Sequence, residues 1–187
     1  NLGVIFKELD ENQKAKSCYE KAIEIKPNYA SAHYNLGTIF QELGEHQKAK
    51  DCFEKAIEIN PNFVEAHYNL GTIFKELGEN QQAKDCYEKT IKINPNYASA
   101  HNNLGVLSQR AGKIKKAKKC YERGIEINPN YTSAHNNLGN IFNELGEYQK
   151  AISCYEKAIE INPNFADAHY NLGNIFNELG EYQKAIS

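Results

Sequence analysis

Proline is the feature of this chain that most restricts its fold, because every proline follows the last at a constant step. The five prolines are each 34 residues apart, at Pro27, Pro61, Pro95, Pro129 and Pro163. The five cysteines and five of the six histidines keep the same step: Cys18, Cys52, Cys86, Cys120 and Cys154, with His33, His67, His101, His135 and His169. A repeat of this length predicts a small structural unit that buries its apolar face by stacking on its neighbours.

The first half of each unit has the pattern of an amphipathic helix. In residues 30–63, apolar side chains recur at spacings of three and four, which place them on one helical face: Ala32, Leu36, Ile39 and Leu43. Gly44 follows this stripe, and a residue that tolerates positive φ is suited to ending a helix and turning the chain. We therefore predict a helix that ends just before Gly44.

The second half of the unit predicts another helix. The same spacings form an apolar face from Ala49, Phe53, Ala56 and Ile57. Pro61 lacks a backbone donor and keeps the preceding residue out of the α region, so this helix is expected to end near Asn60. Asn62 is then in place to cap the next helix. The small Gly37 should let the two helices of a unit approach closely, and the predicted fold class is all-α.

These residues resemble the tetratricopeptide repeat family. The signature positions of that motif are matched by Leu36, Gly37, Phe40, Gly44, Ala49, Phe53, Ala56 and Pro61. The resemblance divides the chain into four full units, 30–63, 64–97, 98–131 and 132–165, and two partial ones, 1–29 and 166–187. It implies a single array over 1–187, a right-handed α-solenoid of antiparallel hairpins whose first helices line a concave groove. Because the chain begins and ends inside a unit, we expect it to be part of a longer protein.

Charge and motif content exclude several function classes. The net charge of −2 provides no positive field of the kind that attracts nucleic acid or anionic membranes. No apolar stretch approaches the roughly 20 residues that cross a bilayer. The sequence has no nucleophile elbow, phosphate-binding glycine loop or catalytic dyad. We therefore predict a protein that is not an enzyme, has no cofactor, and binds a protein or peptide, not a nucleic acid or a membrane.

An asparagine column is the main candidate for the binding surface. The same place in every unit is occupied by Asn1, Asn35, Asn69, Asn103, Asn137 and Asn171. Asparagine is an indifferent helix former, so helix propensity does not explain the column. Its amide both donates and accepts, and a ladder of amides can pair with the backbone of an extended peptide of any sequence. The column is similar to the asparagine ladder in the repeats of O-linked N-acetylglucosamine transferase. The alternative is that these amides cap or brace a neighbouring helix.

Two more columns lie beside the asparagines. One contains Tyr34, Tyr68, Asn102, Asn136 and Tyr170, and the other includes Thr38 and Thr72. Tyrosine combines an apolar ring with a polar tip, which suits an interface. The groove is therefore expected to be more adhesive in the first three units and more polar around Asn102 and Asn136. The alternative is that the tyrosine rings only cover the adjacent helix.

Three functions are compatible with such a groove. The first is a scaffold that holds a peptide or protein segment. The second is the substrate-recruiting arm of a larger enzyme such as a glycosyltransferase, and the third is a scaffold that self-associates end to end through apolar repeat surfaces. Some relatives bind the C-terminal carboxylate of chaperones through basic groove residues. That ligand is disfavoured here, because the equivalent column contains Ser31, Glu65, Ser99, Ser133 and Asp167.

The unit 98–131 differs from the others. It has seven basic residues against Glu122 and Glu126, a balance of +5: Arg110, Lys113, Lys115, Lys116, Lys118, Lys119 and Arg123. Such a run is either a solvated face or a patch for an acidic partner, and the first interpretation is favoured. Ser108 and Gly124 stand where other units have larger residues, so this unit is expected to have the weakest interfaces.

The histidine and cysteine columns do not have the spacing of a metal site. Zinc ligands lie a few residues apart or in two converging pairs, whereas like residues here are one whole unit apart. We expect a packing role for both columns and no metal. Unpaired thiols suit a reducing compartment, so the expected location is the cytoplasm.

Overall fold

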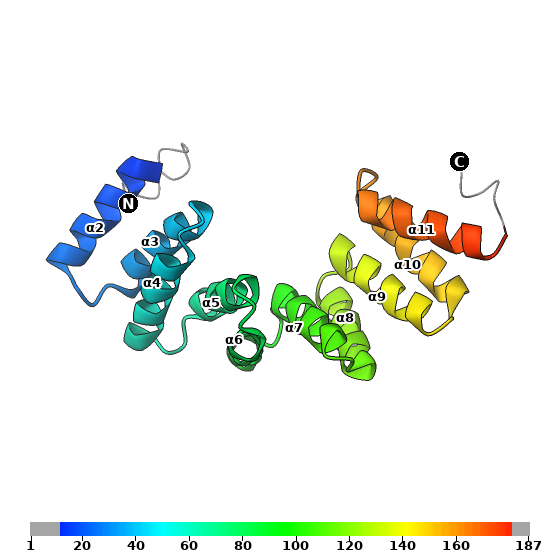
Figure 1. The fold of residues 1–187 in the computed structure, drawn as a ribbon. Coiled ribbons are helices and arrows are strands. Elements are labelled where there is room, and N and C mark those ends of the chain that lie inside the picture. Colours follow the sequence, from blue (N-terminus) through cyan, green and yellow to red (C-terminus); the bar gives the residue numbers. More distant parts are fainter. Residues whose placement is uncertain (1–11, 181–187) are drawn as a thin grey trace. The chain divides into compact units, whose positions relative to one another are not determined.

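The computed structural model describes residues 12–180, and this part of the chain consists of ten α-helices without a strand (Figure 1). The helices are α2 (Asn12–Ile25), α3 (Ala30–Glu42), α4 (His46–Ile59), α5 (Val64–Glu76), α6 (Asn80–Ile93), α7 (Ala98–Arg110), α8 (Ile114–Ile127), α9 (Thr132–Glu144), α10 (Tyr148–Ile161) and α11 (Ala166–Glu178). The chain divides into two compact units, at 1–95 and 96–187. The first contains the hairpins α3–α4 and α5–α6, and the second contains α7–α8 and α9–α10. The all-α prediction is confirmed.

Each hairpin turns at a glycine in the left-handed region, as the sequence predicted. Gly44 has φ 72° and would point a Cβ into open space. The N–H of Gly44 donates to the Gln41 carbonyl at 3.0 Å, and that of Glu45 donates to the Phe40 carbonyl at 2.8 Å. This is the Schellman arrangement, which satisfies the last carbonyls of α3. Glycines with positive φ also follow α5, α7, α9 and α11, at Gly78, Gly112, Gly146 and Gly180.

The second helix of a hairpin ends at the asparagine before proline, as expected, but the predicted cap at Asn62 is wrong. Helix α5 begins after Phe63 and has no side-chain cap. Asn60 is extended, with φ −129°, and its Oδ1 accepts a hydrogen bond from the Asn62 N–H at 3.2 Å. Because Pro61 holds Asn60 out of the α region, the Asn60 side chain closes a turn over the proline. Asn128 and Asn162 do the same at 3.1 Å.

The two helices of a hairpin touch at a glycine, which confirms the close approach expected at Gly37. A Cβ added there would lie 2.8 Å from Cε1 of Phe53 and 3.1 Å from Cβ of Cys52. Phe53 is completely buried. One turn further along α3, the lysine ammonium groups of Lys16 and Lys48 each lie 5.3 Å from the centre of the Phe40 ring. The aromatic ring thus joins α2, α3 and α4 by packing and by cation–π contact.

In the unit 98–131, smaller residues are accommodated without an unpaired polar group. Ser108 is buried, and its hydroxyl donates to the Leu104 carbonyl of the same helix at 2.7 Å. Gly124 is also buried, but a Cβ added there would meet its nearest neighbour, the Ala98 carbonyl oxygen, only at 3.5 Å. The space around Gly124 is therefore large enough for the alanine found in sibling units.

Candidate functional site

The asparagine column lies on the first helix of successive hairpins, one residue per helix. Within the described chain it consists of Asn35 on α3, Asn69 on α5, Asn103 on α7, Asn137 on α9 and Asn171 on α11. Asn103 is buried, with 8% of its surface exposed, and the other four are half-buried. Asn1 lies outside the described residues. The column is therefore partly accessible, but it is not a row of fully solvated amides.

The amide nitrogens of this column bridge neighbouring first helices. Nδ2 of Asn69 donates to Oη of Tyr34 at 3.2 Å, and Nδ2 of Asn137 donates to Oδ1 of Asn102 at 3.1 Å. Nδ2 of Asn171 donates to Oδ1 of Asn136 at 3.0 Å. Each bond spans 35 residues, so every donor meets the tyrosine-or-asparagine column of the preceding unit. This geometry corresponds to the bracing role that the sequence left open as an alternative.

Bracing does not use all the hydrogen-bonding capacity of these amides. A side-chain amide has two N–H donors and an oxygen that accepts up to two bonds. Within residues 12–180, no protein donor reaches the Oδ1 of Asn69, Asn137 or Asn171. Asn69 and Asn137 also retain one N–H, whereas Asn171 makes a second bond to Oδ1 of Asn140 at 3.1 Å. Asn137 and Asn171 in the second compact unit thus present acceptors one repeat apart to water or a ligand, and Asn69 presents one in the first compact unit.

The tyrosines beside the column are packed against the next helices. The Tyr34 ring lies 5.8 Å from the Phe53 ring and 4.9 Å from the Phe63 ring, centre to centre. The ring centres of Tyr68 and Tyr87 are likewise 5.8 Å apart. Burial and the nearby Glu65 raise the pKa of Tyr34, while the bond from Asn69 opposes this shift. Tyr170, on the last described helix, is 71% exposed.

The threonine hydroxyls are used within the fold. Thr38 donates to the Asn35 carbonyl at 2.8 Å, and Thr72 lies 3.2 Å from the Tyr68 carbonyl. The Thr72 hydroxyl is also 3.4 Å from Oη of the buried Tyr87. The Thr72 hydroxyl therefore connects α5 to the core tyrosine of α6.

Sequence reasoning missed two polar partners of the buried tyrosines, Asn140 and Gln109. Asn140 occupies the threonine column of its unit, and its Oδ1 accepts from Tyr155 Oη at 2.8 Å as well as from Asn171. Gln109 accepts from Tyr121 Oη at 3.0 Å. The signal was the change of the core aromatic residue from Phe53 to tyrosine at Tyr87, Tyr121 and Tyr155. A polar partner for each tyrosine hydroxyl could have been expected from that change.

Comparison with known proteins decides the family. A model described as "Tetratricopeptide repeat" matches residues 30–63, 64–97 and 98–131. A "TPR repeat" model matches 3–44 and 139–180, and a further "Tetratricopeptide repeat" model matches 120–153. The chain belongs to the tetratricopeptide repeat family. The matched residues include the four hairpins described above.

Solved tetratricopeptide structures have the same fold. A crystal structure of MamA is 26% identical, with a TM-score of 0.78, over 89% of this chain and 97% of that one. YrrB, described as a TPR protein with an unusual peptide-binding site, is 25% identical, with a TM-score of 0.74, over 91% and 88%. PilF of Pseudomonas aeruginosa is 22% identical, with a TM-score of 0.88, over 98% and 83%, and supports the fold alone. The search of curated proteins found no match.

The histidine column of this tetratricopeptide array ties each first helix to the loop before it. Nε2 of His33 lies 2.8 Å from the Pro27 carbonyl oxygen, and Nε2 of His67 lies 3.0 Å from that of Pro61. His135 and His169 make the equivalent contacts at 2.9 Å. Within residues 12–180, no group of three or more histidine, cysteine or acidic side chains is placed to hold a metal ion. In the same range, no helix is long and apolar enough to cross a membrane.

Two of the seven basic residues in the tetratricopeptide unit 98–131 make ring or ion-pair contacts on α8 and α9. Lys118 lies 4.9 Å from the Phe142 ring centre and 3.8 Å from Glu122, and Arg123 pairs with Glu126 at 3.0 Å. Lys115 and Lys119 are exposed on α8. Ion pairs of this exposed kind contribute about 0–1 kcal/mol each, so they do not define a site by themselves.

Proposed function

We propose that this tetratricopeptide array is a scaffold that binds an extended peptide or protein segment along the asparagine column. The observation that carries the proposal is the pair of half-buried amide oxygens at Asn137 and Asn171 on neighbouring first helices, with a third at Asn69 in the first compact unit. None of the three accepts a hydrogen bond from residues 12–180. Successive backbone N–H groups of an extended segment are the donors that such a row fits. The similarity to YrrB, a protein with a peptide-binding site, supports a peptide as the class of ligand.

The bracing bonds favour this role over a purely structural one. A bond from Nδ2 to the preceding unit fixes the amide plane, so the oxygen is held in place before a ligand arrives. An ordered side chain loses less rotamer freedom on binding, and preorganisation of this kind raises affinity. Because the recognised groups belong to the ligand backbone, we expect binding to depend little on the sequence of the ligand. Residues 1–187 act as one array in this proposal, with no chemistry of their own.

A selection from a random peptide library on the immobilised chain provides ligands for the test. Asn69→Ala combined with Asn137→Ala removes two acceptors, and net hydrogen bonds of about 1 kcal/mol each predict a loss of roughly tenfold or more in affinity. Asn62→Ala combined with Asn130→Ala removes two exposed loop amides and is the matched control. Affinities of single selected peptides are measured by fluorescence anisotropy.

A third variant separates ligand contact from bracing. Tyr34→Phe removes only the hydroxyl that accepts from Asn69 and leaves the asparagine itself. If Tyr34→Phe and the double alanine variant reduce affinity equally, the column acts through helix bracing and the proposed contact is wrong. Equal affinity of the double variant and the loop control would also exclude it.

A further inference from the structure

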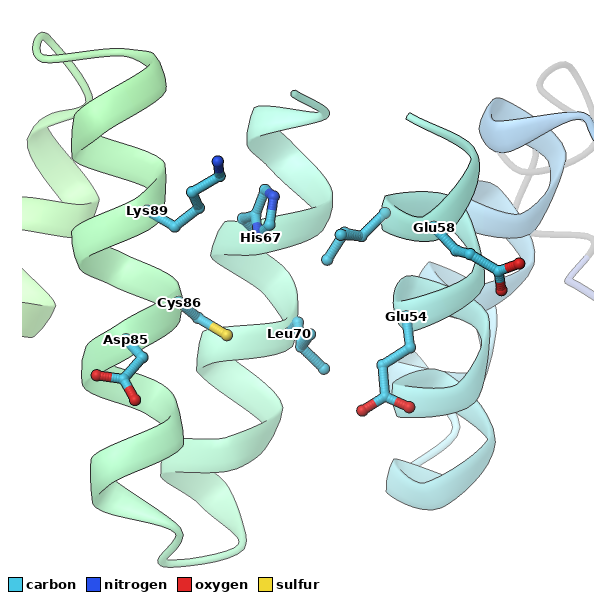
Figure 2. Close-up of a pocket in the computed structure, with 8 residues that line it drawn as sticks. Glu54, Glu58, His67, Leu70, Asp85, Cys86 and Lys89 are labelled. Atoms are coloured by element: carbon cyan, nitrogen blue, oxygen red, sulfur yellow. The ribbon is translucent and has the colours of Figure 1, made fainter. Parts of the chain in front are cut away.

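A second surface of the first compact unit has the form of a binding groove. It is an open groove of about 460 Å³ between α4 and α6, above α5 (Figure 2). We call it the acidic groove, and its lining consists of Glu54, Ile57 and Glu58 from α4, His67 and Leu70 from α5, and Asp85, Cys86 and Lys89 from α6. None of the asparagine column contributes to it. A volume in this range accommodates a few side chains of a partner.

The floor of the acidic groove is apolar and uncharged. Leu70 is 6% exposed, while Ile57 and Cys86 are half-buried. The His67 ring is held against the Pro61 carbonyl, and burial lowers its pKa, so the ring is neutral at neutral pH. Burial also raises the pKa of the Cys86 thiol to about 12, so the thiol remains protonated. An aliphatic side chain placed on this floor would lose apolar surface to the protein without displacing a charged group.

Carboxylates flank the floor from both sides at one end. Figure 2 shows Glu54 extending from α4 towards the groove and Asp85 at the same end on α6, with its carboxylate turned away from the Cys86 sulfur, while Lys89 and His67 lie towards the other end. Both carboxylates contribute, after burial, to the raised pKa of Cys86, which follows Asp85 on α6. Within residues 12–180, no lysine or arginine forms an ion pair with either of them, and Asp85 accepts only from Gln81 Nε2, at 2.8 Å.

This acidity is a property of the first compact unit and not of the repeat in general. The position of Asp85 is also aspartate at Asp51, but it is lysine or serine elsewhere: Ser17, Lys119 and Ser153. Correspondingly, burial, Asp51 and Glu20 raise the pKa of Cys52, whereas burial alone raises that of Cys154. In the second unit, Glu122 is paired with Lys118 at 3.8 Å.

We propose that the acidic groove binds a partner segment in which an arginine adjoins an aliphatic side chain. The planar guanidinium has five N–H donors and can hold a carboxylate such as that of Glu54 through two parallel bonds, which a lysine ammonium does with less geometric fit. The neighbouring aliphatic side chain rests on Ile57, Leu70 and Cys86. The surface is independent of the asparagine column, so the chain can hold two segments at the same time.

The test uses a fluorescein-labelled peptide with one Leu-Arg pair in a glycine and serine background. Fluorescence anisotropy at low salt is expected to give a dissociation constant on the order of 1 mM or below. Glu54→Gln combined with Asp85→Asn should weaken binding about tenfold. The control is Glu122→Gln combined with Glu156→Gln, which removes the two carboxylates that occupy the Glu54 position in the second unit. It should leave the affinity unchanged.

Peptide variants and two further measurements complete the experiment. Peptides with serine in place of leucine, or with lysine in place of arginine, should bind more weakly than the Leu-Arg peptide. Asn69→Ala combined with Asn137→Ala should not affect binding of this probe. The outcome for the acidic groove can therefore be distinguished from the outcome for the asparagine column. The acidic-groove proposal is overturned if the chain does not bind the probe or if both double variants lose affinity equally. Analytical sedimentation of the original chain and of the Glu54→Gln, Asp85→Asn variant tests a second copy of the chain as the occupant. If the original chain self-associates and the variant does not, a second copy occupies the groove and the acidic-groove proposal is overturned.

Discussion

At the scale of single residues, replacement by alanine should have opposite effects on stability at two buried glycines, Gly71 and Gly124. Gly71 on α5 faces Tyr87 on α6, and an added Cβ would lie 2.8 Å from Cε1 of Tyr87 and 3.0 Å from Cβ of Cys86. Gly71→Ala should therefore lower the free energy of unfolding by about 1–2 kcal/mol, because overpacking exceeds the gain in helix propensity. The measurement is urea denaturation followed by circular dichroism.

Gly124 on α8 is the matched control for that substitution. Its added Cβ would meet the Ala98 carbonyl oxygen at 3.5 Å and the Ala134 Cβ at 4.0 Å, which are ordinary contacts. Gly124→Ala should therefore stabilise the chain by about 0.5–1 kcal/mol through the backbone entropy of the unfolded state. Destabilisation by Gly124→Ala, or no effect of Gly71→Ala, would contradict this account of the helix contacts.

The asparagine and tyrosine columns could be found from the sequence, but the use of each polar atom could not. The 34-residue step is sufficient to place Asn69 and Tyr34 in neighbouring columns. Whether Nδ2 of Asn69 reaches Oη of Tyr34 at 3.2 Å depends on the separation and rotation of two packed helices. Small differences in that packing decide whether an amide braces the fold or faces a ligand, and no single-residue pattern encodes them.

At the scale of whole helices, one aromatic ring joins three elements in the second compact unit. Phe142 on α9 is 8% exposed and lies 4.9 Å from Nζ of Lys118 on α8 and 5.4 Å from Nζ of Lys150 on α10. Phe142→Ala removes this packing and both cation–π contacts, and should cost about 3–5 kcal/mol. Ser108 occupies the same position on α7, so Ser108→Ala, which removes one hydroxyl, should cost about 1 kcal/mol.

Thermal unfolding of the Phe142→Ala and Ser108→Ala variants, monitored by circular dichroism, checks this difference. A similar shift of the midpoint for both would mean that the aromatic ring does not join the helices as described. The expectation from sequence that unit 98–131 has the weakest interfaces stays a prediction. It rests on the smaller volume of Ser108 relative to Phe142.

Helix boundaries were the most predictable part of the fold, because they depend on local chemistry. A glycine with positive φ and a proline that excludes the α conformation fix the ends of α3 and α4 at the expected places. The prediction of a cap at Asn62 was wrong because the side chains of Asn60 and Asn62 can both accept hydrogen bonds from backbone N–H groups in this loop. The extended Asn60 is positioned to bond the Asn62 N–H, and this competition is settled by backbone angles that the sequence pattern does not give.

At the scale of the whole molecule, the buried thiols and tyrosines should make stability depend on alkaline pH. Burial raises the pKa of Cys52 and Cys154 from 9.0 to about 11, and that of Cys86 to about 12. Burial likewise raises the pKa of Tyr155 from 10.0 to about 12. In each case the folded state favours the neutral, protonated form, and the unfolded state releases its proton at a lower pH.

The sign of the pH dependence follows from this difference. The unfolded chain binds fewer protons than the folded chain above about pH 9, so the free energy of unfolding decreases there. The contribution is fully present below about pH 9 and is lost as the pH rises through the folded values of about 11 to 12. Urea denaturation should therefore give a constant midpoint from about pH 7 to 8.5 and a falling midpoint from about pH 9 to 11.

A variant with alanine at Cys52, Cys86 and Cys154 identifies the groups responsible. Its midpoint should begin to fall only near pH 10, where unfolded tyrosines ionise, because the thiol contribution has been removed. Since these cysteines occur once in each hairpin, single replacements should remove separate fractions of the effect, as expected for an array whose stability is a sum over units. A midpoint that remains constant to pH 11 in the original chain would show that the thiols are not held neutral by burial.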